Sequence, residues 1–122
     1  MGLDMYAYST TIRINQPVDF AEPPAFEEIH YWRKHPNLHG WMERLYRRKG
    51  GTDTDFNLSA VRLDPADLDV LEAAVLGRKL PETSGFFFGQ SDGSEQLDDL
   101  SFIAKAREEI AAGKTVFYLA WW

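Results

Sequence analysis

Residues 31–41 read Tyr-Trp-Arg-Lys-His-Pro-Asn-Leu-His-Gly-Trp, and a strongly basic segment follows them. Pro36 divides this stretch, because the residue before a proline avoids the helical conformation and proline itself suits the first position of a helix. We therefore expect a helix that begins at Pro36, ends near Arg48 and is stopped by the glycine pair at 50–51. Its buried stripe at helical spacing would consist of Leu38, Trp41, Leu45 and Met42.

The chain before this helix predicts one strand and leaves a second segment open. Residues 2–14 begin with an apolar and polar alternation and continue with β-branched side chains, which predicts a strand with Leu3, Met5 and Ala7 on one face. The prolines of residues 16–24 indicate a loop. Residues 26–34 fit either a helix or a short strand.

The chain after it predicts two strands and two helices. Alternation over residues 56–61 predicts a strand, and Asp64-Pro65 is typical of a helix start, with the stop at Gly77. A last helix is expected from a cap at Ser94 to about Ala112, followed by a strand over 115–122 that is apolar on both faces and so central in a sheet or pressed against a partner. The side chains expected to face inward are Leu68, Leu71, Ala74 and Val75 on the first of these helices and Leu97, Leu100, Ile103, Ala104 and Ile110 on the second.

This order of elements predicts an α+β fold, a small and mostly antiparallel sheet with about three helices packed on it. At 122 residues the chain is expected to be a single domain, 1–122. A doubly wound α/β fold is disfavoured, because no strand is followed by a glycine-rich phosphate turn.

The charge balance excludes some classes of partner. The net charge is −6, and it is uneven: residues 1–50 carry seven Lys or Arg against six Asp or Glu, whereas residues 51–122 carry six against thirteen. Such an acidic body disfavours nucleic-acid binding, which needs a continuous basic surface. A small phosphorylated ligand or an acidic protein edge stays compatible with the basic segment. The chain has no cysteine, no secretory signal and no membrane span, so we expect a cytoplasmic protein.

Aromatic and basic side chains in two stretches form the candidate binding site. Rings from both stretches could stack a flat ligand while the cations and an imidazole hold a phosphate, and the alternative is that the rings belong to the core. The candidate binding residues are Tyr31, Trp32, Arg33, Lys34, Asn37, His39, Trp41, Ser84, Phe86 and Phe87.

The sequence assigns no metal, no cofactor and no catalytic residue. His35 and His39 are four apart, but Pro36 should leave His35 outside the helix and so prevent a shared metal site. A nucleophilic set of Ser84, His39 and Asp4 would require the fold to bring the three together. Enzymatic activity is therefore the less favoured hypothesis, with a small hydrolase that uses His39 or a nucleotide binder as the alternative function.

Three motifs carry a resemblance: Met-Gly-Leu-Asp-Met-Tyr at 1–6, Tyr-Trp-Arg-Lys at 31–34 with Asn37, His39 and Trp41, and Ser-Gly-Phe-Phe-Phe-Gly at 84–89. Over residues 1–89 the chain resembles a family of small uncharacterised proteins of tailed bacteriophages and prophages, although His35-Pro36 stands where small residues are expected. The resemblance implies a phage accessory protein that acts by binding and inhibits a host or bacterial defence component, for example as an anti-CRISPR-like or other anti-defence inhibitor in the host cytoplasm. A homodimer through the C-terminal strand, with Trp121 and Trp122, is a further expectation.

Overall fold

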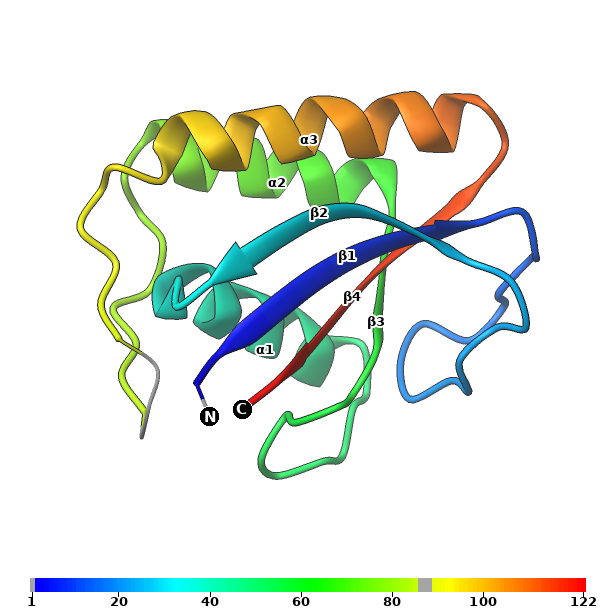
Figure 1. Ribbon diagram of the computed structural model, residues 1–122, viewed down its shortest axis with the longest axis horizontal. Helices are drawn as coiled ribbons and strands as arrows, with labels where there is room; N and C mark the ends of the chain where they lie inside the picture. Colours follow the sequence, from blue (N-terminus) through cyan, green and yellow to red (C-terminus); the bar gives the residue numbers. More distant parts are fainter. Residues whose placement is uncertain (1, 86–88) are drawn as a thin grey trace.

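A four-stranded antiparallel sheet and three helices make up the molecule, whose computed structural model describes residues 2–85 and 89–122 (Figure 1). The α+β fold class is confirmed. The strands are β1 (Asp4–Thr10), β2 (Glu27–Arg33), β3 (Val61–Leu63) and β4 (Thr115–Trp121), in the sheet order β2-β1-β4-β3. The helices are α1 (Pro36–Arg48), α2 (Pro65–Leu76) and α3 (Gln96–Ala111).

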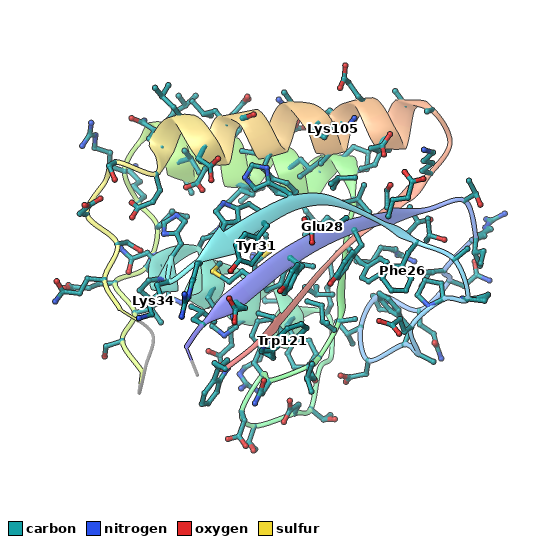
Figure 2. The ribbon with its side chains drawn as sticks, in the orientation of Figure 1. Phe26, Glu28, Tyr31, Lys34, Lys105 and Trp121 are labelled. Carbon is teal, nitrogen blue, oxygen red and sulfur yellow. The ribbon has the colours of Figure 1, made fainter. Side chains whose placement is uncertain are left out.

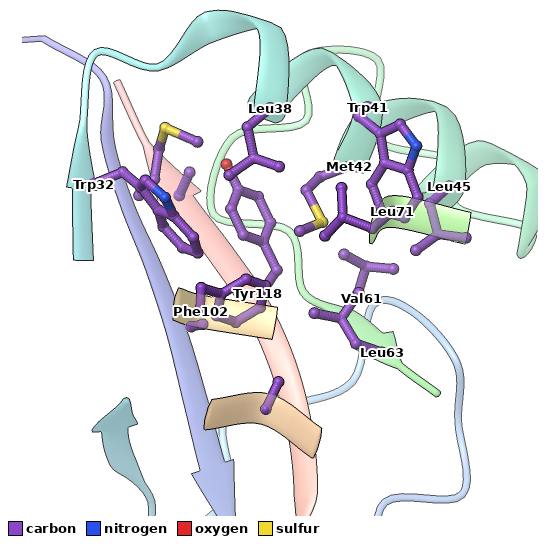
Figure 3. Close-up of a cluster of buried hydrophobic side chains, with 14 of the residues drawn as sticks. Trp32, Leu38, Trp41, Met42, Leu45, Val61, Leu63, Leu71, Phe102 and Tyr118 are labelled. Carbon is purple, nitrogen blue, oxygen red and sulfur yellow. The ribbon is translucent and has the colours of Figure 1, made fainter. Parts of the chain in front are cut away.

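The helices share one face of the sheet and leave the other without a helix. Figure 1 shows α1 behind the strands and α2 beside α3 along one edge. The strand side chains that point toward the helices, such as Met5, Trp32 and Tyr118, belong to one buried cluster with residues of all three helices. Figure 3 shows Tyr118 in this cluster between Trp32 and Val61. Burial of these large apolar side chains is the main stabilising contribution to the fold.

The first strand is shorter than its sequence pattern predicts. Leu3, Met5 and Ala7, which the alternation places on one face, are fully buried. The strand ends at Thr10 because the Thr10 hydroxyl accepts a hydrogen bond from the Ile12 amide and donates one to the Ala25 carbonyl, which turns the chain away from the sheet. The segment whose pattern fitted either a helix or a strand is a strand: residues 27–33 form β2, antiparallel to β1.

The strand predicted over residues 56–61 is wrong, because regular strand begins only at Val61. Phe56 and Leu58 have φ values of 48° and 60°, and this left-handed conformation is incompatible with a strand. The Asp53 carboxylate stabilises this backbone conformation of residues 56–60, because it accepts hydrogen bonds from the Asn57 amide and from the Ser59 hydroxyl. These bonds also lower the pKa of Asp53.

The first two helices agree with the prediction from the sequence. The third helix differs from it in which side chains face the core. Helix α1 spans Pro36–Arg48, and Asp64 and Asp67 form a capping box at the start of α2. On α3 the expected inward residues Leu97 and Ala104 are exposed, and the residue at the N-cap position is Glu95 rather than Ser94. The buried positions of α3 are Asp99, Phe102, Ile103 and Ala106.

Strand β4 is internal, as its apolar faces predicted. It pairs with β1 along its whole length and with β3 at its first half, and the Leu58 amide bonds to the Ala120 carbonyl beyond β3. Both edges of β4 are therefore occupied over its first half, which leaves no free edge there for pairing with a second copy. The homodimer through the C-terminal strand stays a prediction. Within the described residues, no helix has both the length and the apolar character needed to cross a membrane.

Candidate functional site

The structure separates the candidate residues that the sequence grouped together. Trp32, Trp41 and His39 lie in the core, with exposed fractions of 3%, 7% and 1%. His39 projects from α1 between Phe56 and Tyr118, and its Nδ1 lies 2.7 Å from the Tyr118 hydroxyl. These two rings and the imidazole are therefore structural, and His39 is not available to a ligand at the surface.

Tyr31, Arg33 and Lys34 are exposed at the end of β2. The Tyr31 hydroxyl donates a 2.6 Å hydrogen bond to Asp4 Oδ1, and Arg33 Nε lies 3.9 Å from the same oxygen. Lys34 packs near Gly89, where an added Cβ would lie 2.9 Å from Lys34 Cβ. Figure 2 shows Tyr31 over the strands and Lys34 beyond the end of β2.

Asn37 and Ser84 line a hollow on the helix side of the molecule. The hollow continues into a smaller one of about 120 Å³, and Asn37 and Ser91 belong to both. Phe86 and Phe87 lie outside the described residues. Of the candidate binding residues, only Asn37 and Ser84 thus meet in a described concavity, while Tyr31 and Arg33 lie on the sheet.

A buried chain of polar groups forms the wall of the smaller hollow. His35 Nε2 lies 2.9 Å from Asp99 Oδ2, His35 Nδ1 lies 2.7 Å from Ser91 Oγ, and Trp32 Nε1 donates to Asp99 Oδ1 at 3.1 Å. The side chains of His35 and Asp99 are 4% and 2% exposed. Ser91 is half-buried, and its hydroxyl oxygen also accepts a hydrogen bond from the Asn37 amide.

Close packing against α1 fixes Thr83, which lines the larger hollow together with Ser91. Gly40 lets Thr83 approach the helix, because a Cβ at position 40 would lie 1.9 Å from Thr83 Oγ1. Asn37 Oδ1 accepts a hydrogen bond from the Thr83 amide, which holds Thr83 at the start of α1. His35 gives the helix no side-chain cap, and Ser91 supplies one from a distant part of the chain.

The face of the sheet without helices carries a row of aromatic rings across β2, β1 and β4. The Tyr6 ring lies 5.1 Å from that of Tyr31 and 4.9 Å from that of Trp121, between centroids, and stacks on Tyr8 at 5.7 Å. Tyr31 and Trp121 are each 42% exposed. Figure 2 shows both on the viewed side of the sheet, with Glu28. We call Tyr6, Tyr31, Leu119 and Trp121 the aromatic face.

The loop between β1 and β2 covers the other half of this side of the sheet. Phe20 packs edge-on against Phe117, and Phe26 packs edge-on against Tyr8. A groove of about 180 Å³ remains where this loop meets β4, beside the aromatic face. It is lined by Phe20, Glu22, Leu58, Ala60, Phe117 and Leu119.

Carboxylates border the aromatic face. The hydrogen bond to Asp4 raises the pKa of Tyr31 to about 12. Burial, followed by the interactions with Tyr6, Glu28 and Glu22, raises the pKa of Tyr8 to about 12. Arg33 is the nearby cation, and its guanidinium already faces Asp4. The potential over these rings therefore favours a cation.

Comparisons with known proteins identify no relative. No family model, no curated protein and no solved structure matches the chain. The resemblance to phage and prophage proteins accordingly stays a prediction from the motifs.

Sequence reasoning missed Ser91 and Asp99, and it named Tyr31 and Trp121 without placing them together on one face of the sheet. Asp99 could have been found, because Asp99, Phe102, Ile103 and Ala106 follow the spacing of a buried helical stripe that contains one acid. An acid at such a position needs a buried donor. Ser91 carries no comparable local signal, since its partners are more than fifty positions away. Among the described residues, no cluster of three or more His, Asp and Glu side chains could hold a metal ion.

Proposed function

We propose that this protein acts by binding a partner protein through the aromatic face and its adjoining groove. The observation that carries the proposal is the exposure of two large rings, Tyr31 and Trp121, on a sheet face that no helix covers. Exposed aromatic side chains of this kind are enriched in the energetic centres of protein interfaces. The separation of Arg33, His39 and Ser84 into three places supports protein binding over a nucleotide pocket built from those residues.

The chemistry of the face indicates a basic partner segment with a large apolar side chain. Tyr6, Tyr31 and Trp121 offer ring faces to a Lys or Arg, and Asp4 and Glu28 lie beside them. The groove accepts an apolar side chain. The same carboxylates disfavour a nucleic acid, whose phosphates would be repelled. The phage resemblance supports a host or defence protein as the partner, and hence an inhibitor, such as an anti-CRISPR-like one, in the cytoplasm of the infected cell.

A displayed library of random peptides, selected on the immobilised full chain, tests the chemistry of the partner. We expect enriched peptides with Lys or Arg next to Trp, Phe or Leu, and binding that weakens as salt is raised. Trp121→Ala and Tyr31→Ala should each weaken binding of an enriched peptide at least about tenfold. Leu97→Ala is the matched control, because Leu97 is an exposed apolar residue on α3, away from this face.

Two results would count against the proposal: enrichment of acidic peptides, or binding that survives the loss of both rings. Glu28→Lys provides a separate test of charge, since Glu28 is exposed and should weaken binding of basic peptides without loss of folding. Self-association of the wild-type chain that Trp121→Ala abolishes would replace the partner with a second copy. The partner itself would then be sought by comparing captures from host lysate with wild-type and Trp121→Ala protein.

A further inference from the structure

We propose that Ser91 is an activated nucleophile and that the hollow at the start of α1 is a small acyl-ester or thioester hydrolase site. The site is separate from the aromatic face and does not depend on the binding function. It rests on the chain of hydrogen bonds from Asp99 through His35 to Ser91 and on the hollow into which Ser91 opens.

The order of groups is that of a nucleophile, a base and an orienting acid. Asp99 Oδ2 accepts the hydrogen on His35 Nε2, which leaves Nδ1 as an acceptor for the Ser91 hydroxyl 2.7 Å away. This fixes the tautomer that a general base requires. Trp32 Nε1 holds the second oxygen of Asp99, so the carboxylate cannot rotate away. Asp99 and Trp32 are thus positioning residues, and Ser91 and His35 are the catalytic residues.

The surroundings of Ser91 favour the negative charge that develops in acyl transfer. The Asn37 amide at the start of α1 donates to Ser91 Oγ at 3.1 Å, and the helix N-terminus carries a partial positive charge. The Asn37 side chain is held by its Oδ1, which accepts from the Thr83 amide. Its Nδ2 has no hydrogen-bond partner among residues 2–85 and 89–122, and Asn37 lines the hollow with Ser91. The side-chain Nδ2 of Asn37 is the donor to the oxyanion.

Arg78 indicates the class of substrate. It lines the same hollow, and its guanidinium makes no ion pair or hydrogen bond within the described part of the chain. Arg78 also has a φ of 54°, a left-handed conformation two residues after the end of α2. Glu95 is occupied at both oxygens by the amides of Asp92 and Gly93. A volume of about 120 Å³ then fits a small acyl group that bears a carboxylate.

The reaction proceeds in two balanced halves. Ser91 Oγ attacks the carbonyl carbon, its proton passes to His35 Nδ1, and the carbonyl oxygen becomes an oxyanion that Asn37 Nδ2 stabilises. The bond to the leaving alcohol or thiol then breaks, and that group departs with the proton from His35. Water attacks the acyl-serine by the same route, with His35 as base, and releases the acid and the free Ser91 hydroxyl.

A fluorophosphonate probe tests the nucleophile on the full chain. We expect one equivalent on Ser91 by peptide mass analysis and no labelling of Ser91→Ala. His35→Gln should slow the labelling at least about 100-fold. Ser94→Ala is the matched control, because Ser94 is an exposed serine nearby whose hydroxyl bonds to Asp92. Labelling of Ser91 no faster than that of Ser94 would overturn the proposal.

A second measurement remains informative where His35→Gln does not fold. Hydrolysis of p-nitrophenyl acetate and of its succinate counterpart is compared in wild type and Arg78→Gln. We expect a preference for the anionic ester in wild type, and Arg78→Gln should remove this preference by raising KM for the anionic ester. Saturable succinate binding without turnover would mean an anion pocket only and would refute the hydrolase.

Discussion

Acidification should destabilise the fold through His39. The imidazole is 1% exposed, and its ring centroid lies 5.0 Å from that of Phe56. Burial lowers the pKa of His39 to about 4, because the imidazolium would lose its hydration in the core. In the unfolded chain the pKa is 6.5, so between these two values the unfolded state binds more protons than the folded state.

The sign and the size of the effect follow from these two pKa values. Well above pH 6.5 the imidazole is neutral in both states and the stability is fully present. As the pH falls, the free energy of unfolding decreases by at most about 1.4 kcal/mol per pH unit. Between pH 7 and pH 5 the loss is about 2 kcal/mol, and it reaches about 3 kcal/mol near pH 4. The lowered pKa values of Asp53 and Glu109 add a loss of the same sign on acidification, but their unfolded-state values of 3.8 and 4.5 place most of it below pH 5.

Urea unfolding at pH 7 and pH 5, followed by tryptophan fluorescence, measures this loss. His39→Gln keeps a polar group that faces the Tyr118 hydroxyl but cannot titrate, so the variant should lose about 2 kcal/mol less than wild type between the two pH values. His30→Gln is the control, because His30 contacts Asp98 at the surface of α3 and its loss should leave the His39 contribution intact. A His39→Gln variant with the same pH dependence as wild type would refute the reasoning.

Two further substitutions test the packing by the same urea measurement. Trp32→Phe keeps the ring in the core but removes the donor to Asp99 Oδ1, and the unpaired buried oxygen should cost about 1–3 kcal/mol of stability. Unchanged stability would mean that water replaces the indole. Leu71→Ala removes a fully buried side chain and should cost about 2–5 kcal/mol, whereas Leu97→Ala at an exposed position should change stability by less than about 0.5 kcal/mol. Equal costs at the two leucines would contradict the observed phase of the helices.

Local signals made the first two helices predictable from the sequence. Pro36 and the glycine pair after α1 act within one turn of the helix ends, and the Asp64 cap of α2 does the same. The predicted phase of α3 is wrong at Leu97 and Ala104, which are exposed, and right at Ile103, which is buried. The hydrogen bonds of Asp99 explain the observed phase. Because a buried carboxylate needs hydrogen-bond donors, Asp99 faces inward where Trp32 and His35 can bind it.

Contacts distant in sequence could not be predicted. Residues 56–60 alternate between apolar and polar side chains as a strand does, but they form a loop. The Asn57 amide and the Ser59 hydroxyl donate to the Asp53 carboxylate, so this segment does not join the sheet. The aromatic face depends on which side of the sheet the helices cover, and alternation in β1 defines two faces without saying which one is buried. The cluster of tryptophans and histidines at 30–41 therefore predicted a surface site where the fold places core.

Strand β2 separates the two candidate sites by the alternation of its side chains. Tyr31 points to the aromatic face, and Trp32, its neighbour, points to the core and holds Asp99 in place for His35. One strand thus contributes to a binding surface on one side and to a polar chain behind a hollow on the other. Because six of the seven residues of β2, all except Ile29, are paired with β1, truncation of the Tyr31 ring leaves the backbone that positions Trp32 in register. The binding proposal and the hydrolase proposal can for this reason be refuted separately, each by substitutions that leave the other site intact.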